Sequence, residues 1–340
     1  MSEHDKLIVS SSPHLHSADS IPRVMWSVVG ALVPASLVSI YFFGLQSALV
    51  IAVSVAGCLA AEALLAKMLG KPLSLKDGSA AVTGLLLALN LPAGAPWWMV
   101  LIGCLVAIGL GKMIYGGLGH NIFNPALIAR VFLLISFPVQ MTNWLVPKPL
   151  FGGAASDAVT GATPLGLVKE AAMFGKPISS LDLPSWSQMA AGYMSGSLGE
   201  ISAIALLLGA LYLLYKGYIT WHTPVSFIGT AVVLGHIFHL VKPEAYPSGM
   251  FHLVSGGLML GALFMATDMV TSPMTGKGQL IFGAGCGLIT VIIRLFGGYP
   301  EGVSFAILLM NATVPLIDRY TTPKKFGFVP PEKKTGGEPA

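Results

Sequence analysis

The chain has 340 residues, of which 54% are hydrophobic and 10% are charged, and its mean hydropathy is +0.76. Soluble domains carry about 25% charged residues, so this composition excludes a soluble globular protein and predicts an all-α protein that crosses a membrane many times. The formal charge of +4 indicates no nucleic-acid partner, because Lys and Arg lie near the ends of apolar segments rather than along one basic face.

The first residues, 1–22, are polar and lack the basic, apolar and small-residue regions of a cleavable signal peptide. Apolar segments separated by Gly, Pro and charged residues then predict about ten transmembrane helices. They cover residues 24–43, 45–67, 79–92, 97–115, 122–138, 198–215, 222–241, 250–267, 279–297 and 302–319. We therefore expect five parts, namely residues 1–22, two transmembrane groups at 23–138 and 198–319, a connection at 139–197, and a tail at 320–340.

The distribution of basic residues predicts the sidedness of these segments. With the N-terminus placed in the cytoplasm, thirteen of the nineteen Lys and Arg residues fall on the cytoplasmic side and six outside. This bias follows the positive-inside rule. We therefore expect both termini in the cytoplasm, residues 139–197 outside it, and the chain in the cytoplasmic (inner) membrane of a bacterium.

The two transmembrane groups have features in common. Pro92 and Pro273 follow apolar segments at a separation of 181 residues, and the pairs Gly116-Gly117 and Gly297-Gly298 have the same separation. Five crossings is an odd number, so the second group would enter the membrane in the opposite direction, which predicts two inverted five-helix repeats. Chance recurrence in a chain with 40 Gly and 23 Pro is the alternative.

Two short segments at matching positions, Asp77–Pro92 and Met265–Pro273, combine carboxylates and hydroxyls with apolar residues. Interrupted helices in two related halves point to a central binding site, because the interruption exposes backbone groups to a ligand. Capping of helices at the cytoplasmic surface explains the same residues.

A few charged or ligating side chains fall within apolar segments. Arg130 lies in the middle of one, which makes it a candidate functional residue. Glu62 and Arg294 lie near predicted segment ends, and we expect them to extend toward the membrane surface. His236 and His239 are three residues apart on a predicted helix, but no third ligand is in view, so we predict no metal site.

A threonine in the long connection is the strongest candidate for chemistry. In residues 157–165, Thr163 is followed by Pro164 and an apolar run, which is typical of a helix N-cap with proline at the first helical position. Capping alone explains this pattern. The hydroxyl would also be well exposed, flanked by the small residues Gly161 and Ala162, and placed at the positive end of a helix dipole, where a phosphate is stabilised.

Five motifs, in this order, extend over nearly the whole chain: Asp77–Leu89, Gly116–Ala126, Asp157–Thr163, Ala266–Pro273 and Gly298–Asp318. Together they resemble the RnfD family, which supplies one membrane component of Rnf electron-transport complexes. This family is related to the B component of the sodium-pumping NADH:quinone oxidoreductase. The long N-terminal extension expected of that relative does not precede the first apolar segment, which favours the Rnf side.

The resemblance implies a covalent flavin. In the family, the last threonine of the signature D-x-x-[S/T]-G-A-T is joined to FMN through a phosphoester bond by a flavin transferase that uses FAD outside the cytoplasm. The matching residue is Thr163, and Asp157, Thr160, Gly161 and Ala162 complete the signature. We predict residues 139–197 outside the cytoplasm, which is the side on which the transferase of the family acts.

The resemblance also implies a second flavin, a non-covalent riboflavin near the cytoplasmic side. Asn121, Phe123 and Asn124 offer it a polar edge and an aromatic face, although a helix that starts with Asn and Pro explains them equally well. Arg130 is a further candidate for binding a flavin phosphate.

The resemblance and the missing motifs together define the expected function. The chain has no nicotinamide fingerprint and no cysteine spacing for an iron–sulfur cluster. We therefore expect a flavin-carrying subunit that relays electrons within a larger complex of the ferredoxin:NAD type, coupled to Na+ or H+ transport, and not catalytic alone. Its partners would be the other subunits and the flavin transferase. The alternatives are a channel or secondary transporter on the same inverted-repeat fold, without a redox role, and a scaffolding subunit.

Overall fold

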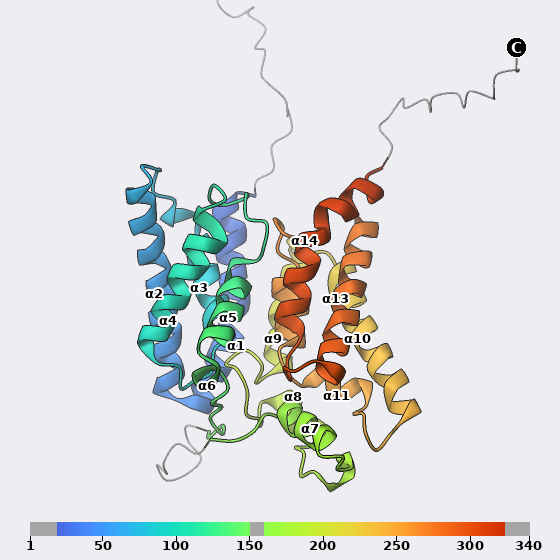
Figure 1. The fold of residues 1–340 in the computed structure, drawn as a ribbon. Helices are drawn as coiled ribbons and strands as arrows, with labels where there is room; N and C mark the ends of the chain where they lie inside the picture. Colours follow the sequence, from blue (N-terminus) through green and yellow to red (C-terminus); the bar gives the residue numbers. More distant parts are fainter. Residues whose placement is uncertain (1–18, 150–159, 324–340) are drawn as a thin grey trace, which may run out of the picture.

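The computed structural model describes residues 19–149 and 160–323, and that part of the chain is helical (Figure 1). The first group of helices comprises α1 (Ile21–Phe43), α2 (Leu45–Met68), α3 (Ser79–Leu89), α4 (Trp97–Ile108) and α5 (Pro125–Ser136). The second comprises α9 (Ala203–Tyr215), α10 (His222–Val241), α11 (Gly249–Val254), α12 (Leu258–Leu260), α13 (Gly276–Phe296) and α14 (Val303–Thr321). Between them lie α6 (Pro138–Met141), α7 (Pro164–Met173) and α8 (Trp186–Ala191).

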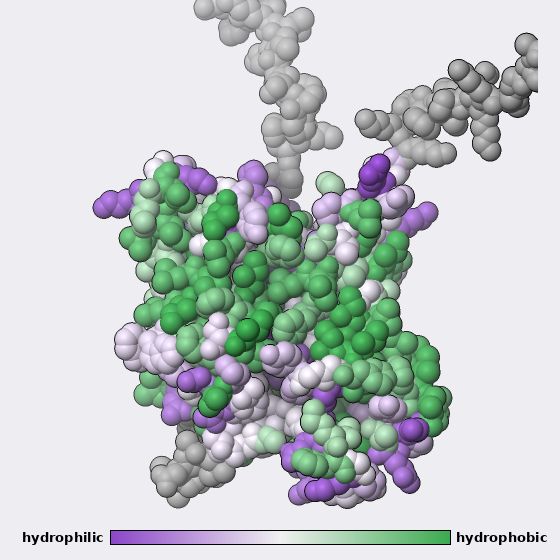
Figure 2. Space-filling model, in the orientation of Figure 1, coloured by the Kyte–Doolittle hydropathy of each residue, from purple (hydrophilic) through white to green (hydrophobic). Residues whose placement is uncertain are grey.

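Several of these helices have the length and composition of membrane spans. Among the described residues, α1, α2, α10 and α13 are long and apolar enough to cross a bilayer, and α3, α4, α5 and α9 are shorter apolar helices. In Figure 2 a wide hydrophobic band surrounds the middle of the molecule, with hydrophilic residues at both ends. Trp26 in the second turn of α1, Trp186 at the start of α8 and Trp221 at the N-cap of α10 are exposed near helix ends, positions that suit aromatic residues at membrane interfaces.

The start of α1 and the end of α14 lie at the same end of the bundle, at the top of Figure 1. Helices α6, α7 and α8 lie at the opposite end. An arrangement of this kind is what the expected sidedness requires of α1, α14 and the long connection. We call these ends the α1 end and the α7 end.

The third helical element of the first group is short, as the sequence predicts, whereas the crossing expected at 250–267 in the second group is broken into pieces. Helix α3 has 11 residues, which corresponds to about 16 Å, roughly half of the hydrocarbon thickness. It follows Gly78, whose φ of 79° suits glycine, and Asp77 Oδ1 accepts the Ser79 amide hydrogen at 2.8 Å. In the second group, the expected crossing at 250–267 consists of α11, α12 and a π-helical turn at Gly261–Met265.

The expectation that Glu62 and Arg294 extend to the membrane surface is wrong, because both side chains are buried in the bundle. Glu62 pairs with Lys112, whose Nζ lies 2.9 Å from each carboxylate oxygen. Arg294 donates to the backbone oxygens of His252 at 2.9 Å and Ser255 at 3.0 Å. The break between α11 and α12 leaves these carbonyls without helical partners, and the guanidinium replaces the missing donors.

Small residues let the helices of the two groups approach closely. A Cβ atom on Gly209 in α9 would run into the carbonyl oxygen of Ala31 in α1. On α13, a Cβ on Gly283 would lie 2.6 Å from the Thr223 oxygen of α10. Such contacts are typical of helix packing in membranes, where apolar area alone gives little drive for association. The free cysteines Cys58, Cys104 and Cys286 are buried in this packed interior.

Candidate functional site

Thr163 is the N-cap of α7, at the α7 end of the bundle. Its Oγ1 accepts the Gly166 amide hydrogen at 3.0 Å, and Pro164 occupies the first turn, so the predicted capping role is confirmed. The residue is half-buried rather than well exposed. It lies on the wall of a cavity, so its hydroxyl stands between the surface and the interior.

The neighbouring signature residues form a short extended segment. The Gly161 amide donates to the Trp144 oxygen at 2.9 Å. A Cβ on Gly161 would lie 2.9 Å from Val146 Cγ2 and 3.0 Å from Ser195 Oγ, so a side chain there would displace its neighbours. Thr160 and Ala162 are exposed. Asp157 lies outside the described residues.

The cavity beside Thr163, which we call the Thr163 pocket, encloses about 600 Å³ counted out to its mouth. Apolar and aromatic side chains dominate its walls, with a charged cluster at one side. It is lined by Arg130, Leu134, Met141, Thr142, Trp144, Thr163, Pro164, Leu165, Met194, Ser195, Glu200, Gly256, Tyr299, Pro300 and Glu301.

Arg130 is the centre of the charged cluster. It lies in α5, is 5% exposed, and forms an ion pair with Glu301 through NH2. Its NH1 donates to Asn90 Oδ1 at 3.0 Å and to Ser304 Oγ at 2.8 Å. Glu200 Oε1 is 3.6 Å from NH2 and has no hydrogen-bond partner among the residues that the structure describes. The structure therefore brings the two predicted residues Arg130 and Thr163 to one pocket.

Sequence reasoning missed Glu200 and Glu301. Both lie outside the helices, in the segments that precede α9 and α14. The expected crossing at 198–215 begins as a helix only at Ala203, which leaves Glu200 in the preceding turn. The sequence feature that could have identified them is a single acidic residue at the edge of each apolar segment.

The two carboxyl groups have different electrostatic environments. Burial, followed by the negative charge of Glu301, raises the pKa of Glu200 to about 8 despite the nearby Arg130. Burial also acts to raise the pKa of Glu301, but the charges of Arg130 and Arg294 outweigh it and leave that pKa lowered, at about 2. Glu301 is thus the ionised partner of Arg130, whereas Glu200 holds a proton at neutral pH.

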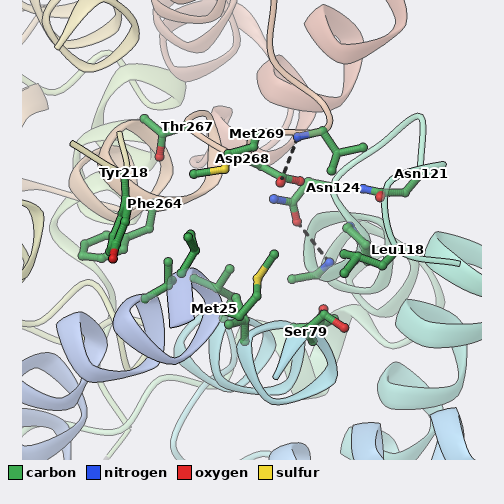
Figure 3. Close-up of a pocket in the computed structure, with 18 of the residues that line it drawn as sticks. Met25, Ser79, Leu118, Asn121, Asn124, Tyr218, Phe264, Thr267, Asp268 and Met269 are labelled. Atoms are coloured by element: carbon green, nitrogen blue, oxygen red, sulfur yellow. Dashed lines mark hydrogen bonds between the residues drawn. The ribbon is translucent and has the colours of Figure 1, made fainter. Parts of the chain in front are cut away.

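A second cavity, the Asn121 pocket, lies between the two groups toward the α1 end and encloses about 830 Å³ counted out to its mouth (Figure 3). In Figure 3, Asn121, Asn124 and Asp268 lie on one side of the opening, and Tyr218 and Phe264 on the other. Its lining is Val24, Met25, Val28, Ser79, Val82, Thr83, Leu86, Lys112, Leu118, Asn121, Asn124, Pro125, Ala126, Leu213, Tyr218, Ile219, Phe264, Thr267, Asp268, Met269 and Val270.

The two predicted asparagines reach this pocket by different routes. Asn124 is the N-cap of α5, where its Oδ1 accepts from the Ala126 amide at 3.1 Å, and its Nδ2 donates to the Met265 oxygen of the second group at 3.3 Å. Asn121 is buried, and its Nδ2 donates to the Phe123 oxygen at 3.3 Å. Phe123 itself is half-buried and is not among the lining residues, where Tyr218 and Phe264 supply the aromatic faces.

The Asn121 pocket has little available positive charge among the described residues that line it. The lining cation, Lys112, gives its donors to the two oxygens of Glu62 and to Ser79 Oγ at 2.5 Å. Asp268 adds a carboxyl group, and burial raises its pKa. The pocket therefore suits an uncharged polar ligand better than a phosphate.

Within residues 19–149 and 160–323, no cluster of three or more His, Cys, Asp or Glu side chains could hold a metal ion. His236 and His239 have ring centroids 6.2 Å apart. The Nδ1 atom of His239 lies 2.8 Å from the Tyr246 oxygen, which gives this ring a structural hydrogen bond.

The profile of the NQR2, RnfD, RnfE family matches residues 8–327. The chain belongs to this family. It is 48% identical over 328 residues to the D component of the Na(+)-translocating ferredoxin:NAD(+) oxidoreductase complex of Acetobacterium woodii, covering 96% of this chain and 98% of the relative. It is 46% identical to the corresponding component of the proton-translocating complex of Clostridium ljungdahlii, covering 94% and 96%. The D component of the ion-translocating oxidoreductase complex of Stutzerimonas stutzeri is 44% identical, covering 91% and 92%.

Proposed function

We propose that this chain is a membrane subunit of an ion-translocating ferredoxin:NAD oxidoreductase complex, in which it carries FMN esterified to Thr163 and relays electrons coupled to Na+ or H+ transport. The names of its relatives support the complex. The observation that carries the flavin is the position of Thr163, which caps a helix on the wall of a pocket that also contains Arg130.

The residues of the Thr163 pocket fit a flavin. Thr163 Oγ1 would form the phosphoester, and the first-turn amides of α7 would face the negative charge of the phosphate. Trp144 and Tyr299 supply aromatic faces, and the Oε1 of Glu200, which has no partner among the described residues, is a polar group on the inner wall. Bound FMN would supply one-electron and two-electron chemistry, while these residues anchor it, exclude water and set its electrostatic surroundings.

The Asn121 pocket supports a second, non-covalent flavin of the riboflavin type. Asn121, Asn124 and Asp268 present polar groups to the opening, with Tyr218 and Phe264 opposite them. Riboflavin lacks the phosphate of FMN. Among the described lining residues no cation is available to pair with a phosphate, which favours riboflavin over FMN in this pocket.

The architecture we propose is ten membrane crossings in two inverted five-helix repeats, with both termini in the cytoplasm of a bacterium and the chain in its inner membrane. Two features support it, namely the short or broken third element of each group and the shared end of α1 and α14. Each pocket also uses the segment before a fifth helix, Leu118–Asn124 in one case and Tyr299–Glu301 in the other.

The partners that follow from this function are the other subunits of the complex and a flavin transferase. The exposed signature residues Thr160 and Ala162 leave one side of the Thr163 segment accessible to that enzyme. The mature chain would exchange electrons with neighbouring subunits through its two flavin pockets, one toward each end of the bundle.

The decisive experiment is expression of the chain together with a flavin transferase, followed by denaturing gel electrophoresis and in-gel fluorescence. We expect a fluorescent band that survives boiling and disappears in Thr163→Val. The matched control is Thr142→Val, which makes the same change in the same pocket at a hydroxyl that bonds only to helix carbonyls. A wild-type chain without covalent flavin under these conditions would refute the redox function and favour a channel or secondary transporter.

A further inference from the structure

We propose that Glu200 is the proton-binding group of the Thr163 pocket, and that in alkaline solution, where its carboxylate is ionised, it takes up one proton when an electron reaches the flavin on Thr163. This inference rests on the proposed function, because it needs a flavin in this pocket. It makes Glu200 the residue that binds a proton when an electron arrives in the pocket.

The first observation is a buried carboxyl oxygen without a partner. Glu200 is 6% exposed and lines the same pocket as Thr163. Within residues 19–149 and 160–323 its Oε1 accepts no hydrogen bond, and Arg130 NH2 is 3.6 Å away. Because an unpaired buried charge is costly, this oxygen needs either a proton or a donor from a ligand.

The second observation is that the neighbouring carboxylate already holds the cation. Glu301 Oε2 forms the ion pair with Arg130, and Glu301 Oε1 accepts the Gly257 amide hydrogen. Arg130 also donates to Asn90 and Ser304. The hydrogen bonds of this guanidinium therefore go to groups other than Glu200, which leaves an ionised Glu200 poorly stabilised.

The charged groups that face Glu200 are Arg130 from α5, Glu301 from the segment before α14, and Arg294 from α13 at a greater distance. Two carboxyl groups that share one guanidinium disfavour double ionisation. Burial and Glu301 together raise the pKa of Glu200 to about 8. An additional negative charge in the pocket would raise its proton affinity further.

The step balances in charge and atoms. A one-electron donor of the complex delivers one electron to the pocket, and water at the α7 end delivers one proton to Glu200 Oε1, where an O–H bond forms. The net charge of the pocket is unchanged. When the electron leaves, the O–H bond breaks and the proton returns, so proton release accompanies reoxidation.

The test is a redox titration of the purified, flavin-loaded protein with dithionite from about pH 6 to pH 10, comparing the wild type with Glu200→Gln. Glutamine imitates the protonated acid, so the two proteins should agree at pH 7, where Glu200 already holds its proton. At a fixed potential, the ratio of reduced to oxidised flavin should fall more steeply with pH in the wild type than in Glu200→Gln above about pH 8. The difference in slope should be about a factor of ten per pH unit, because one proton is bound for each electron. The matched control Glu170→Gln makes the same change on the exposed side of α7 and should follow the wild type.

A second readout needs no variant. At pH 9 the infrared difference between reduced and oxidised wild type should show a carboxylate band replaced by a protonated carboxyl band, which shifts in heavy water. The band should be absent in Glu200→Gln and present in Glu170→Gln.

The outcomes are distinguishable. Absence of covalent flavin on the wild type refutes the proposed function itself. If flavin is attached, parallel titration curves of wild type and Glu200→Gln above pH 8 overturn the inference. A constant offset between the two curves at every pH also overturns the inference. Such an offset would show that the substitution changes the flavin potential without any change in proton binding. A wild type without the carboxyl band at pH 9 overturns the inference even if the variant fails to fold.

Discussion

Removing Lys112 should destabilise the protein strongly, because it is the counter-ion of a fully buried carboxylate. Glu62 has no exposed surface, and Lys112 is 2% exposed. In Lys112→Met the carboxylate keeps only the Ser74 hydroxyl, at 2.5 Å. Breaking a buried ion pair from one side costs about 3–5 kcal/mol, most of which is the penalty of an unpaired charge rather than the value of the pair.

The double variant Glu62→Gln with Lys112→Met removes both charges and should recover most of that loss. Glutamine retains an oxygen for Ser74, so we expect the double variant to lie within about 1 kcal/mol of the wild type. The double variant should therefore be about 2–4 kcal/mol more stable than Lys112→Met alone, and a double-mutant cycle that includes Glu62→Gln should show that the two sites are coupled. Lys67→Met, on the exposed face of α2, is the control and should change stability by no more than about 0.5 kcal/mol.

The assay is unfolding of the purified protein in mixed micelles with increasing SDS, followed by far-ultraviolet circular dichroism. The double-mutant cycle gives the coupling energy directly. A loss below about 1 kcal/mol in Lys112→Met, or a double variant as unstable as the sum of the two single variants, would show that Glu62 is not held as the charged partner of Lys112.

Three further predictions concern packing, pH and the signature. Gly209→Ala should lower the free energy of unfolding by several kcal/mol and Gly30→Ala should not, because a Cβ on Gly209 meets the Ala31 carbonyl whereas one on Gly30 has no neighbour within 4 Å. Thermal unfolding in detergent would separate the two. The pKa of Glu200 rises from 4.5 to about 8 on folding, so the folded state binds its proton more tightly than the unfolded state. Wild-type stability should therefore fall as the pH rises through this interval, and Glu200→Gln should lack that component in the same assay; identical pH profiles would contradict it. Gly161→Ala should weaken the in-gel flavin band, because its Cβ would displace the side chains of Val146 and Ser195 beside Thr163, and an undiminished band would show that the segment adapts without cost.

The cluster around Arg130 shows how a charge in the middle of an apolar segment is stabilised. Intramembrane charges are rare and usually paired. Here Arg130 joins Asn90 from the end of α3, Ser304 from α14 and Glu301 from the segment before it. It therefore ties the two groups of helices together and at the same time places a positive charge on the wall of the Thr163 pocket.

The membrane character of this protein could be predicted from sequence because it depends on composition and local pattern. Depletion of charge marks the apolar segments, and Gly and Pro mark where the third elements stop, since both residues act on the backbone of their own turn. The cap at Thr163 was predictable for the same reason, because Thr followed by Pro satisfies the first amides of its own helix. The distribution of Lys and Arg is consistent with the start of α1 and the end of α14, which lie at the same end of the bundle.

What only the tertiary structure decided is which polar groups meet. Arg130 and Glu301 are 171 residues apart, and Lys112 and Glu62 are 50 apart, so no local pattern specifies either pair. The expectation that Glu62 and Arg294 reach the membrane surface failed because their partners come from other helices or from a break in the backbone. Glu200 gained its significance in the same way. Its burial, its unpartnered oxygen and its position in the pocket of Thr163 follow from how the segments before α9 and α14 pack against α5, which depends on the fold as a whole.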